Sequence, residues 1–170
     1  DGASTILDVG TGSGAIAVAL AHELPAAQVV AVDCSAEALA VARDNAALNG
    51  VDGRISFQEG DLFALESAEY ELVVSNPPYI PATDIPTLMP EVRDHEPRGA
   101  LVGGEDGLEA YRALARQAPT LLRAQGWLLV EVGIGQAEAV AELLETEGLR
   151  HISVRADYAG IPRVVAGQKP

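Results

Sequence analysis

Short apolar runs alternate with stretches of helical character along most of this 170-residue chain. Most of the apolar runs are continuous, as in strands that are covered on both faces. This alternation predicts an α/β fold with a mostly parallel sheet and helices on both faces. The predicted strands are Thr5–Asp8, Gln28–Asp33, Ile55–Glu59, Tyr70–Ser75 and Gly126–Val132. The predicted helices are Gly14–Glu23, Ser35–Asn49, Gly107–Leu122 and Gln136–Glu147.

The C-terminal part departs from the alternation. Two short β-like runs, His151–Arg155 and Arg163–Gly167, are separated by turn residues that include Gly160 and Pro162. Such spacing is typical of an antiparallel hairpin. The sequence therefore predicts seven strands in one sheet, with an antiparallel hairpin at one edge.

Capping signals mark the ends of two predicted helices. Ser35 is a natural N-cap and Gly50 a natural stop for the second helix. Asp106 and Glu109 have the spacing of a capping box at the start of the third. These signals sharpen the helix boundaries.

Composition limits the classes of partner. Acidic residues outnumber basic residues by 25 to 11, so the net charge is −14, and the deficit of cations is spread along the chain. Duplex binding depends on cations that neutralise phosphates, so nucleic acid is not expected as a direct partner. No apolar run approaches the roughly 20 residues that span a bilayer, and no membrane association is expected.

Residues 1–170 are expected to form one soluble, monomeric domain. The single cysteine, Cys34, cannot form an internal disulfide and is expected to be a small core residue in a cytoplasmic protein. The histidines are far apart in sequence, and no metal site is predicted. The chain begins at Asp1 without a methionine, which suggests a fragment of a longer parent protein.

A glycine loop follows the first strand. The run DVGTGSGA, residues 8–15, ends that strand and opens the first helix, as in a loop that binds an adenosine cofactor. Gly10 and Gly12 permit a tight turn and close approach of a ligand, and Gly14 or Ala15 lets the helix lie close to the sheet. The loop alone does not distinguish NAD from other adenosine cofactors.

Two acids follow the next two strands. Asp33 lies at the distance beyond the loop where a carboxylate accepts hydrogen bonds from both ribose hydroxyls; capping of the following helix is its alternative role. Asp61 ends the third strand and can reach an adenine amino group, or it is a solvated turn aspartate. The next residue is Leu62.

The run VVSNPPYI ends the fourth strand in an unusual way. Pro77 and Pro78 fix their own φ angles, cannot donate backbone hydrogen bonds and restrict the residues before them. Residues 76–79, called here the hook, are therefore expected to be stiff and to carry a carboxamide and an aromatic ring beyond the sheet. Ligands bind in open α/β sheets where the strand order reverses, so the glycine loop and the hook are predicted to share one crevice.

The stretch from Ile80 to Glu105 shows no clear periodicity and contains prolines at 81, 86, 90 and 97. Long irregular stretches of this kind are usually functional or disordered. Because it directly follows the hook, this stretch is predicted to form part of a site wall or a lid.

The motifs resemble a known family. DVGTGSGAIAVAL, the acid Asp33 and NPPYI are similar to class I S-adenosylmethionine-dependent methyltransferases that modify planar nitrogens. NPPYIP, HEPRGALVGGEDGL, LLVEVGIGQ and GIPRVVAG more narrowly resemble the PrmC/HemK family, which methylates the glutamine amide of peptide chain release factors. The family also has an N-terminal recognition domain, which has no counterpart in residues 1–170.

The resemblance implies a Rossmann-like seven-stranded sheet, S-adenosylmethionine as cofactor, S-adenosylhomocysteine as product and a release factor as partner. In this reading, the Asn76 oxygen and the Pro77 carbonyl accept the two amide hydrogens, Pro78 contacts the substrate, and Tyr79 stacks on the amide or packs on the core. The implied cofactor-binding residues are Gly10, Thr11, Gly12, Ser13, Gly14, Asp33, Asp61, Leu62 and Asn76.

Other residues have open roles. Glu96 and Pro97 match the family pattern and can also order the long loop, while Glu131 and Gln136 either support the crevice or cap the last helix. Three alternative functions compete with release-factor methylation: methylation of a ribosomal-protein glutamine, methylation of an adenine or guanine amino group in DNA or RNA, and cofactor binding without turnover.

Overall fold

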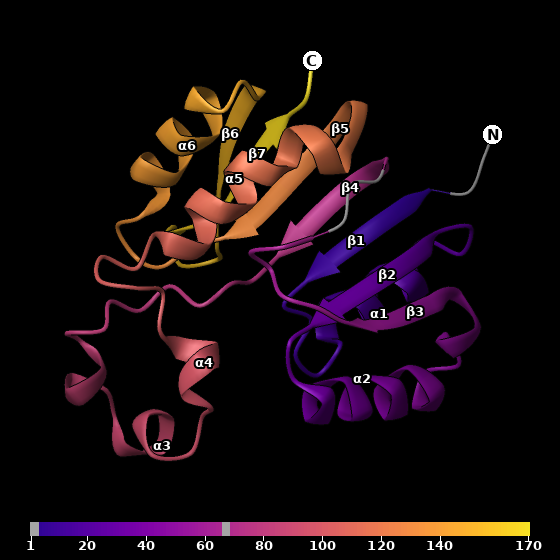
Figure 1. The fold of residues 1–170 in the computed structure, drawn as a ribbon, viewed down its shortest axis with the longest axis horizontal. Coiled ribbons are helices and arrows are strands. Elements are labelled where there is room, and N and C mark those ends of the chain that lie inside the picture. Colours follow the sequence, from indigo (N-terminus) through magenta and orange to yellow (C-terminus); the bar gives the residue numbers. More distant parts are fainter. Residues whose placement is uncertain (1–3, 66–68) are drawn as a thin grey trace.

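A seven-stranded sheet organises the chain, in the order β3-β2-β1-β4-β5-β7-β6 (Figure 1). The structure is a computed structural model and describes residues 4–65 and 69–170. The strands are β1 (Thr5–Val9), β2 (Gln28–Asp33), β3 (Ile55–Glu59), β4 (Tyr70–Ser75), β5 (Leu122–Glu131), β6 (Arg150–Ala156) and β7 (Pro162–Gln168). The first five strands pair in parallel, and β7 pairs antiparallel to both β5 and β6. The predicted sheet and its terminal hairpin are confirmed.

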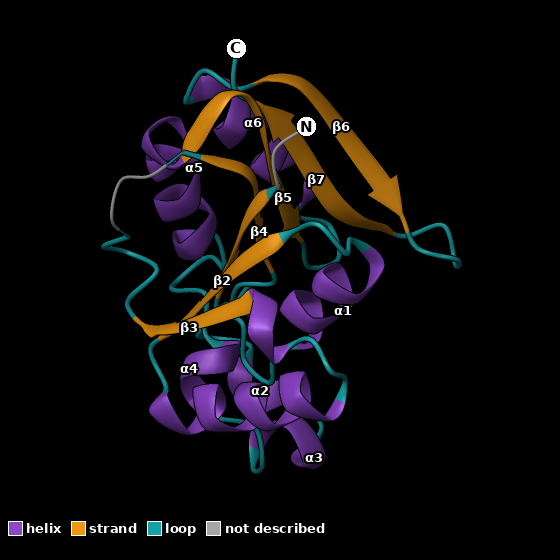
Figure 2. Cartoon of the chain, turned by 90° about the vertical axis from the view of Figure 1, so that its right-hand side faces the viewer, coloured by secondary structure: helices purple, strands orange, loops and turns teal. Residues whose placement is uncertain are grey.

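Helices cover both faces of this sheet, as the continuous apolar strands predict. One face of the sheet packs against α5 and α6 around a core that includes Tyr111 and Leu128, and the other packs against α1 and α2 around Ile6 and Ala17. Figure 2 shows α5 and α1 on opposite sides of the strands. The helices are α1 (Ala15–Glu23), α2 (Ala36–Leu48), α3 (Pro90–Arg93), α4 (Arg98–Leu101), α5 (Glu109–Leu121) and α6 (Ala137–Thr146), with 3-10 turns at Asp52–Arg54 and Ile85–Thr87. None of the described helices is long and apolar enough to cross a membrane.

Two capping predictions have different outcomes. Ser35 is the N-cap of α2, and its hydroxyl accepts a hydrogen bond from the Ala38 amide. The capping box of Asp106 and Glu109 is wrong, because α5 begins only at Glu109 after Leu108. Asp106 instead accepts a hydrogen bond from the Leu108 amide and forms an ion pair with Arg112.

Two further predictions need correction. Strand β5 begins at Leu122, four residues before the predicted start, because its register with β4 shifts by a bulge in which Gln125 adopts a φ of 64°. Cys34 is exposed and is not a core residue, since it lies where the chain turns from β2 into α2.

The stretch after the hook contains three short helical turns, although it lacks periodicity. Figure 1 shows α3 and α4 beyond the carboxyl ends of β1 and β4. The stretch returns to the hook through a parallel bridge between Ile80 and Val102. The Ile80 amide donates to the Leu101 carbonyl, and the Gly103 amide donates to the Ile80 carbonyl. The prediction of a wall beside the hook therefore agrees with the fold.

A buried carboxylate fixes the turn between β1 and α1. Asp8 is fully buried, and its Oδ2 atom accepts hydrogen bonds from the Thr11 hydroxyl at 2.6 Å and the Ala17 amide at 3.0 Å. Its Oδ1 atom has no hydrogen-bond partner among the described residues. Burial raises the pKa of Asp8 from 3.8 to about 6, although the bonds from Thr11 and Ala17 oppose the rise; the nearby charge of Asp33 adds to it.

This buried acid predicts a pH-dependent stability. The folded state holds the Asp8 proton more tightly than the unfolded state. Ionisation of Asp8 therefore lowers the free energy of unfolding; this loss is absent below about pH 4 and complete above about pH 6, where it is about 3 kcal/mol. The free energy of unfolding of the wild type is therefore expected to fall relative to that of Asp8→Asn between pH 4 and pH 7. Urea unfolding across this range measures the difference, and Asp44→Asn, at an exposed carboxylate on α2, is the matched control. A pH-independent difference for Asp8→Asn would contradict the assignment.

Candidate functional site

The ends of β1 and β4 are held side by side at the point where the strand order reverses. Val9 pairs with Ser75 in the parallel ladder, and the buried Ser75 hydroxyl donates a 2.7 Å hydrogen bond to the Val9 carbonyl. Each strand then leads directly into one of the predicted functional segments. Residues 10–14 follow β1 and residues 76–79 follow β4, so two segments that are distant in sequence emerge at one edge of the sheet.

The glycine loop has the backbone conformations that its sequence predicts. Gly10, Gly12 and Gly14 all have positive φ angles, of 69°, 55° and 80°. A Cβ atom at Gly14 would lie 2.9 Å from the Cβ atom of Ala42, so this glycine lets the loop approach α2. The close neighbour of Gly14 is thus a second helix, and the expectation that Gly14 or Ala15 lets α1 lie close to the sheet stays a prediction.

The loop and the hook share one crevice of about 340 Å³. Its walls come from the loop and the start of α1, from Asn76, Pro77, Tyr79 and Ile80, and from Ala100 and Leu101 at the end of α4. The volume is within the range of about 300–1,000 Å³ that is usual for small-molecule sites. None of the described residues that line it is an Asp, Glu, His or Lys.

The start of α1 adds a positive electrostatic end to this crevice. Gly14 is its N-cap and makes no side-chain capping bond, and Ala15 and Ile16 line the crevice. The first amides of a helix have no acceptor within the helix, and the helix dipole is positive there; in α1 the Ala17 amide is taken by Asp8, which leaves those of Ala15 and Ile16. This wall is suited to a carboxylate or another anionic group of a ligand.

The hook presents hydrogen-bond acceptors to the crevice. The Asn76 side chain is exposed, and both Asn76 and Pro77 line the cavity. Neither the Asn76 carboxamide nor the Pro77 carbonyl has a hydrogen-bond partner within residues 4–65 and 69–170. These two oxygens are available to the hydrogens of a bound planar nitrogen.

Tyr79 packs on the core, which is one of the two roles that the sequence left open, and its stacking on a substrate amide stays a prediction. Its half-buried ring packs against the main hydrophobic core, and one ring edge lies against the backbone of Gly133. The same residue lines the crevice beside Pro77. A ring that is fixed by the core can offer a rigid surface to a planar group.

Asp33 lies beneath the glycine loop and does not line the crevice itself. Its Oδ2 atom accepts a 2.8 Å hydrogen bond from the Gly12 amide, and its Oδ1 atom accepts a 2.9 Å bond from the Ser35 amide. An ionised carboxylate has about four acceptor positions, so roughly two remain for the hydroxyls of a ribose. Asp33 therefore supports the loop and binds the amide of Ser35, the N-cap residue of α2, without capping the helix itself. Ribose binding stays a prediction.

Asp61 and Leu62 also lie outside the walls of this crevice. The Asp61 side chain is exposed, and its Oδ1 atom accepts a 2.9 Å bond from the Phe63 amide in a tight turn. Leu62 packs against the core, and its carbonyl accepts a 2.7 Å bond from the Gln117 side chain. The turn interpretation of Asp61 is supported by this geometry, and the adenine contact remains a prediction.

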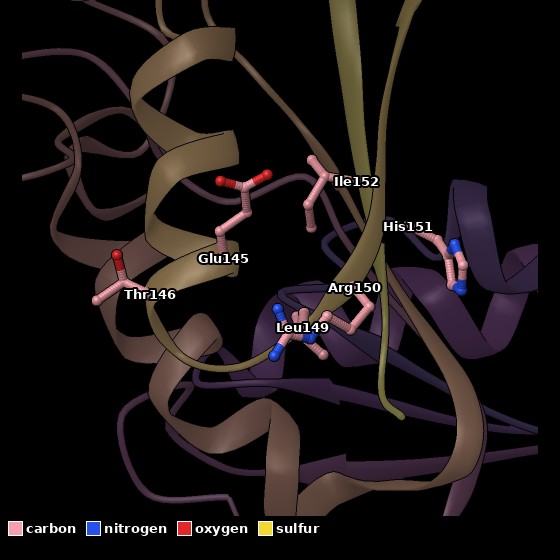
Figure 3. A pocket seen from close by; sticks show the side chains of 6 residues that line it. All are labelled: Glu145, Thr146, Leu149, Arg150, His151 and Ile152. Atoms are coloured by element: carbon pink, nitrogen blue, oxygen red, sulfur yellow. The ribbon is translucent and has the colours of Figure 1, made fainter.

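A second cavity, of about 470 Å³, lies between the end of α6 and the start of β6 (Figure 3). Glu145, Arg150 and His151 surround it, and it contains none of the predicted site residues. Among the described residues there is also no cluster of His, Cys, Asp or Glu side chains that could hold a metal ion. The chemistry-bearing segments are therefore gathered in the crevice at the ends of β1 and β4.

Sequence reasoning missed some contributors to the site. Ala100 and Leu101 were predicted only as part of a wall, because aliphatic side chains carry no chemical signal. Glu96 is exposed and Pro97 is the N-cap of α4, which agrees with a loop-ordering role. The side chain of Gln136 bonds to the hook, and its position in the family-like run LLVEVGIGQ was the available signal.

Comparisons with known proteins identify relatives of this chain. A family model described as the methyltransferase small domain matches residues 2–89, just over half of the chain. Curated proteins from Geobacter sulfurreducens and Cereibacter sphaeroides, both named release factor glutamine methyltransferase, are each 50% identical to it over 167 residues. The alignments cover 98% of this chain but 58% and 60% of the relatives, so the chain spans about three fifths of their length.

Solved structures share the fold of this chain. A methyltransferase from Pyrococcus furiosus has a TM-score of 0.73 at 16% identity and covers 99% of this chain and 76% of its own. A ribosomal protein L11 methylase from Lactobacillus delbrueckii subsp. bulgaricus has a TM-score of 0.70 at 25% identity and covers 98% of this chain and 70% of its own. With its sequence match, its seven-stranded class I methyltransferase sheet and its crevice between β1 and β4, the chain belongs to the methyltransferase small domain family.

Proposed function

We propose that this domain transfers a methyl group from S-adenosylmethionine to the side-chain amide nitrogen of a glutamine, in the Gly-Gly-Gln motif of a peptide chain release factor. The observation that carries the proposal is the crevice that Asn76 and Pro77 line together with the glycine loop. A nucleoside cofactor on the loop and a planar amide on the hook would be neighbours in this space.

The cofactor side of the crevice is assigned to the loop and its acids. The glycines of residues 10–14 let the backbone approach the ligand closely, Asp33 has acceptor positions left for the ribose, and Asp61 and Leu62 follow β3 on the adenine side. The positive end of α1 suits the carboxylate of the amino-acid part. When bound, the cofactor supplies a sulfonium-linked methyl group, which is a good electrophile.

The acceptor side is assigned to the hook. The Asn76 oxygen and the Pro77 carbonyl accept the two hydrogens of the glutamine amide, which turns the nitrogen lone pair toward the loop, and Tyr79 stacks on the amide plane. Pro78 does not line the crevice, and its contact with the substrate stays a prediction. Orientation of this kind can supply on the order of 7–11 kcal/mol of the barrier.

This placement does not require a strong base. No Asp, Glu or His is among the described residues that line the crevice. The methylated nitrogen becomes acidic when the new bond forms, so its surplus proton can leave to solvent from the open crevice. Placement by Asn76 and Pro77 therefore carries the catalysis.

The choice of acceptor rests on the relatives. Proteins that match this chain at 50% identity are named for the glutamine of release factors. A ribosomal protein is the nearest competitor, and the charge of −14 disfavours nucleic acid. The proposal places the domain in the cytoplasm, where release factors act, as a monomer.

The acceptor can be tested directly. The domain is incubated with methyl-labelled S-adenosylmethionine and, in parallel, with release factor, total ribosomal protein and nucleic acid, each in excess. We expect label on the release-factor glutamine, located by peptide mass spectrometry. Label confined to ribosomal protein or nucleic acid would refute the proposed substrate, and cofactor binding without any transfer would support a binding module.

Asn76→Ala should separate binding from transfer. The substitution removes the side-chain oxygen that accepts a hydrogen bond from the substrate amide and orients it, so the rate of methyl transfer is expected to fall at least about 100-fold. Cofactor affinity, measured by calorimetry, should change by less than about threefold, since the loop and Asp33 remain intact. Asn49→Ala, at the exposed end of α2, is the matched control. Equal activity in Asn76→Ala and wild type would exclude the assigned role.

Asp33→Ala should act on the cofactor. Its removal is expected to raise the dissociation constant of S-adenosylmethionine at least about tenfold, since two charge-assisted bonds are lost. Ser35→Ala removes the helix cap, at about 1 kcal/mol of stability, but leaves the carboxylate. Similar dissociation constants for wild type, Asp33→Ala and Ser35→Ala would reduce Asp33 to a structural residue.

A further inference from the structure

The hook is almost without hydrogen bonds of its own. Pro77 and Pro78 have no amide hydrogen, and the Asn76 side chain has no partner among the described residues. Within the described part of the chain, one hydrogen bond reaches residues 76–79 from elsewhere. It is the 3.0 Å bond that the Gln136 side chain donates to the Tyr79 carbonyl.

The Gln136 carboxamide joins three segments. Its Nε2 atom donates to the Tyr79 carbonyl and, at 3.3 Å, to the Gly107 carbonyl, while its Oε1 atom accepts a 3.0 Å bond from the Gly133 amide. These segments follow β4, precede α5 and follow β5. Gln136 is also the N-cap residue of α6, but its side chain makes no capping bond there. The Gln136 side chain therefore bonds to the hook and its surroundings and does not cap the helix.

The seat of this carboxamide is itself fixed. The buried Tyr111 of α5 donates a 2.9 Å hydrogen bond to the Glu131 carbonyl at the end of β5. The next residue, Val132, donates its amide to the Arg163 carbonyl at 2.8 Å. Gly133 and Gln136 thus follow a strand end that is hydrogen-bonded to both α5 and the start of β7.

Three glycines bring the surrounding backbone close to the hook. A Cβ atom at Gly103 would lie 2.7 Å from the Pro78 carbonyl oxygen, and one at Gly107 would overlap the Tyr79 carbonyl. A Cβ atom at Gly133 would lie 2.6 Å from the Gln136 Oε1 atom and 2.9 Å from the Tyr79 ring. The hook therefore lies in a cradle that has no room for side chains.

We propose that Gln136, with Gly103, Gly107 and Gly133, forms a clamp that sets the orientation of the hook, and that Gln136 is a positioning residue for methyl transfer. Gln136 does not line the crevice, so it acts through the Tyr79 carbonyl on the acceptors of Asn76 and Pro77. This inference rests on the proposed function, because it assigns the amide of the substrate to the hook.

A second glutamine provides a contrast on the cofactor side. Gln117 of α5 donates to the Leu62 carbonyl at 2.7 Å and to the Ala113 carbonyl at 3.1 Å, and it accepts a 2.9 Å bond from the Leu65 amide. It holds the turn after β3 in the way that Gln136 holds the hook after β4. Loss of the two side chains should therefore affect different kinetic constants.

Gln136→Leu keeps the approximate volume and removes all three bonds. A displacement of the hook on the order of 1 Å is expected to lower kcat by about 100-fold, while the dissociation constant for the cofactor changes by less than about threefold. Gln117→Leu should mainly raise the KM for the cofactor. Gln168→Leu is the control. Gln168 is the last residue of β7, and the substitution removes a single bond to the Gln125 carbonyl, so kcat and KM are expected to stay at their wild-type values.

Gln136→Glu tests the donor specifically. It retains the chain length and an acceptor for the Gly133 amide, but it turns a carboxylate oxygen toward two carbonyl oxygens. We expect a loss of kcat at least as large as that of Gln136→Leu. Wild-type kcat in Gln136→Glu would show that side-chain packing suffices and would overturn the clamp.

Gly133→Ala tests the cradle without removing a hydrogen-bonding group. The φ angle of Gly133 lies outside the left-handed region, so alanine is strained only by its contacts with Gln136 and Tyr79. We expect a loss of kcat without a loss of cofactor affinity. Gly53→Ala is the matched control, because a Cβ atom there has no neighbour within 4 Å.

Amide hydrogen exchange gives a readout that does not depend on methyl transfer. The Gly133 amide loses its acceptor in Gln136→Leu and should exchange faster, while amides of β1 keep their wild-type rates. If the wild type methylates no amide substrate, the proposed function is refuted. The hydrogen-exchange measurement then still tests the clamp. Unchanged Gly133 exchange, or a wild-type kcat in Gln136→Leu and Gly133→Ala, would overturn the clamp.

Discussion

The parallel pairing of β1 with β4 is the constraint on which the site depends. These strands are separated along the chain by β2, β3 and their helices, yet they are neighbours at the centre of the sheet. Parallel neighbours present their carboxyl ends at one edge, and the helices that follow diverge to opposite faces, so a crevice opens between the two exits. The bond from the Ser75 hydroxyl to the Val9 carbonyl fixes this edge at the positions where the loop and the hook begin. Without that register, neither segment would have a partner.

The glycines of residues 10–14 have no side chains that could pack and hold the loop. Hydrogen bonds from neighbouring side chains of the protein hold it instead. Asp8 binds Thr11 and Ala17, Asp33 binds the Gly12 amide, and Asn45 donates to the Ser13 carbonyl. The supporting groups all come from the protein side, which leaves the outer surface of the loop to a ligand. The cost is a buried acid beside a second acid, and the raised pKa of Asp8 reflects it. Stability at neutral pH is thus lowered by the same groups that shape the loop.

Local signals predicted most of the fold. The bounds of β2, β3 and β4 agree with the predicted strands, because continuous apolar runs between turn residues report burial on both faces. The early start of β5 was not predictable, since its bulge with a non-glycine residue at positive φ depends on pairing with Tyr70. The capping box failed because the Glu109 amide donates to the Gly103 carbonyl, while Asp106 binds the Leu108 amide and Arg112. Spacing along the chain cannot weigh such competition.

In the site, too, the features with local sequence signals were predicted and the long-range contacts were not. The glycine loop and NPPY were recognisable because few residue types permit their backbone conformations, and the topology rule then placed them together. The bond from Gln136 to Tyr79 joins positions 57 residues apart and has no periodic signal. Its existence depends on the close approach of three segments, which only the folded chain brings about. Long-range polar contacts of this kind remain invisible to patterns of hydrophobicity.

Stiffness and orientation are separate requirements for the hook. The prolines restrict rotation within residues 76–79, but they also remove the donors that would tie the segment to its surroundings. A stiff segment without anchors would move as one body and carry its acceptors with it. Ser75 anchors it at the front through Val9, and Gln136 anchors it at the back through the Tyr79 carbonyl. These two bonds use side-chain donors and backbone acceptors, because the hook itself has so few amide hydrogens to give, whereas the next residue, Ile80, is held by backbone bonds to Leu101 and Gly103.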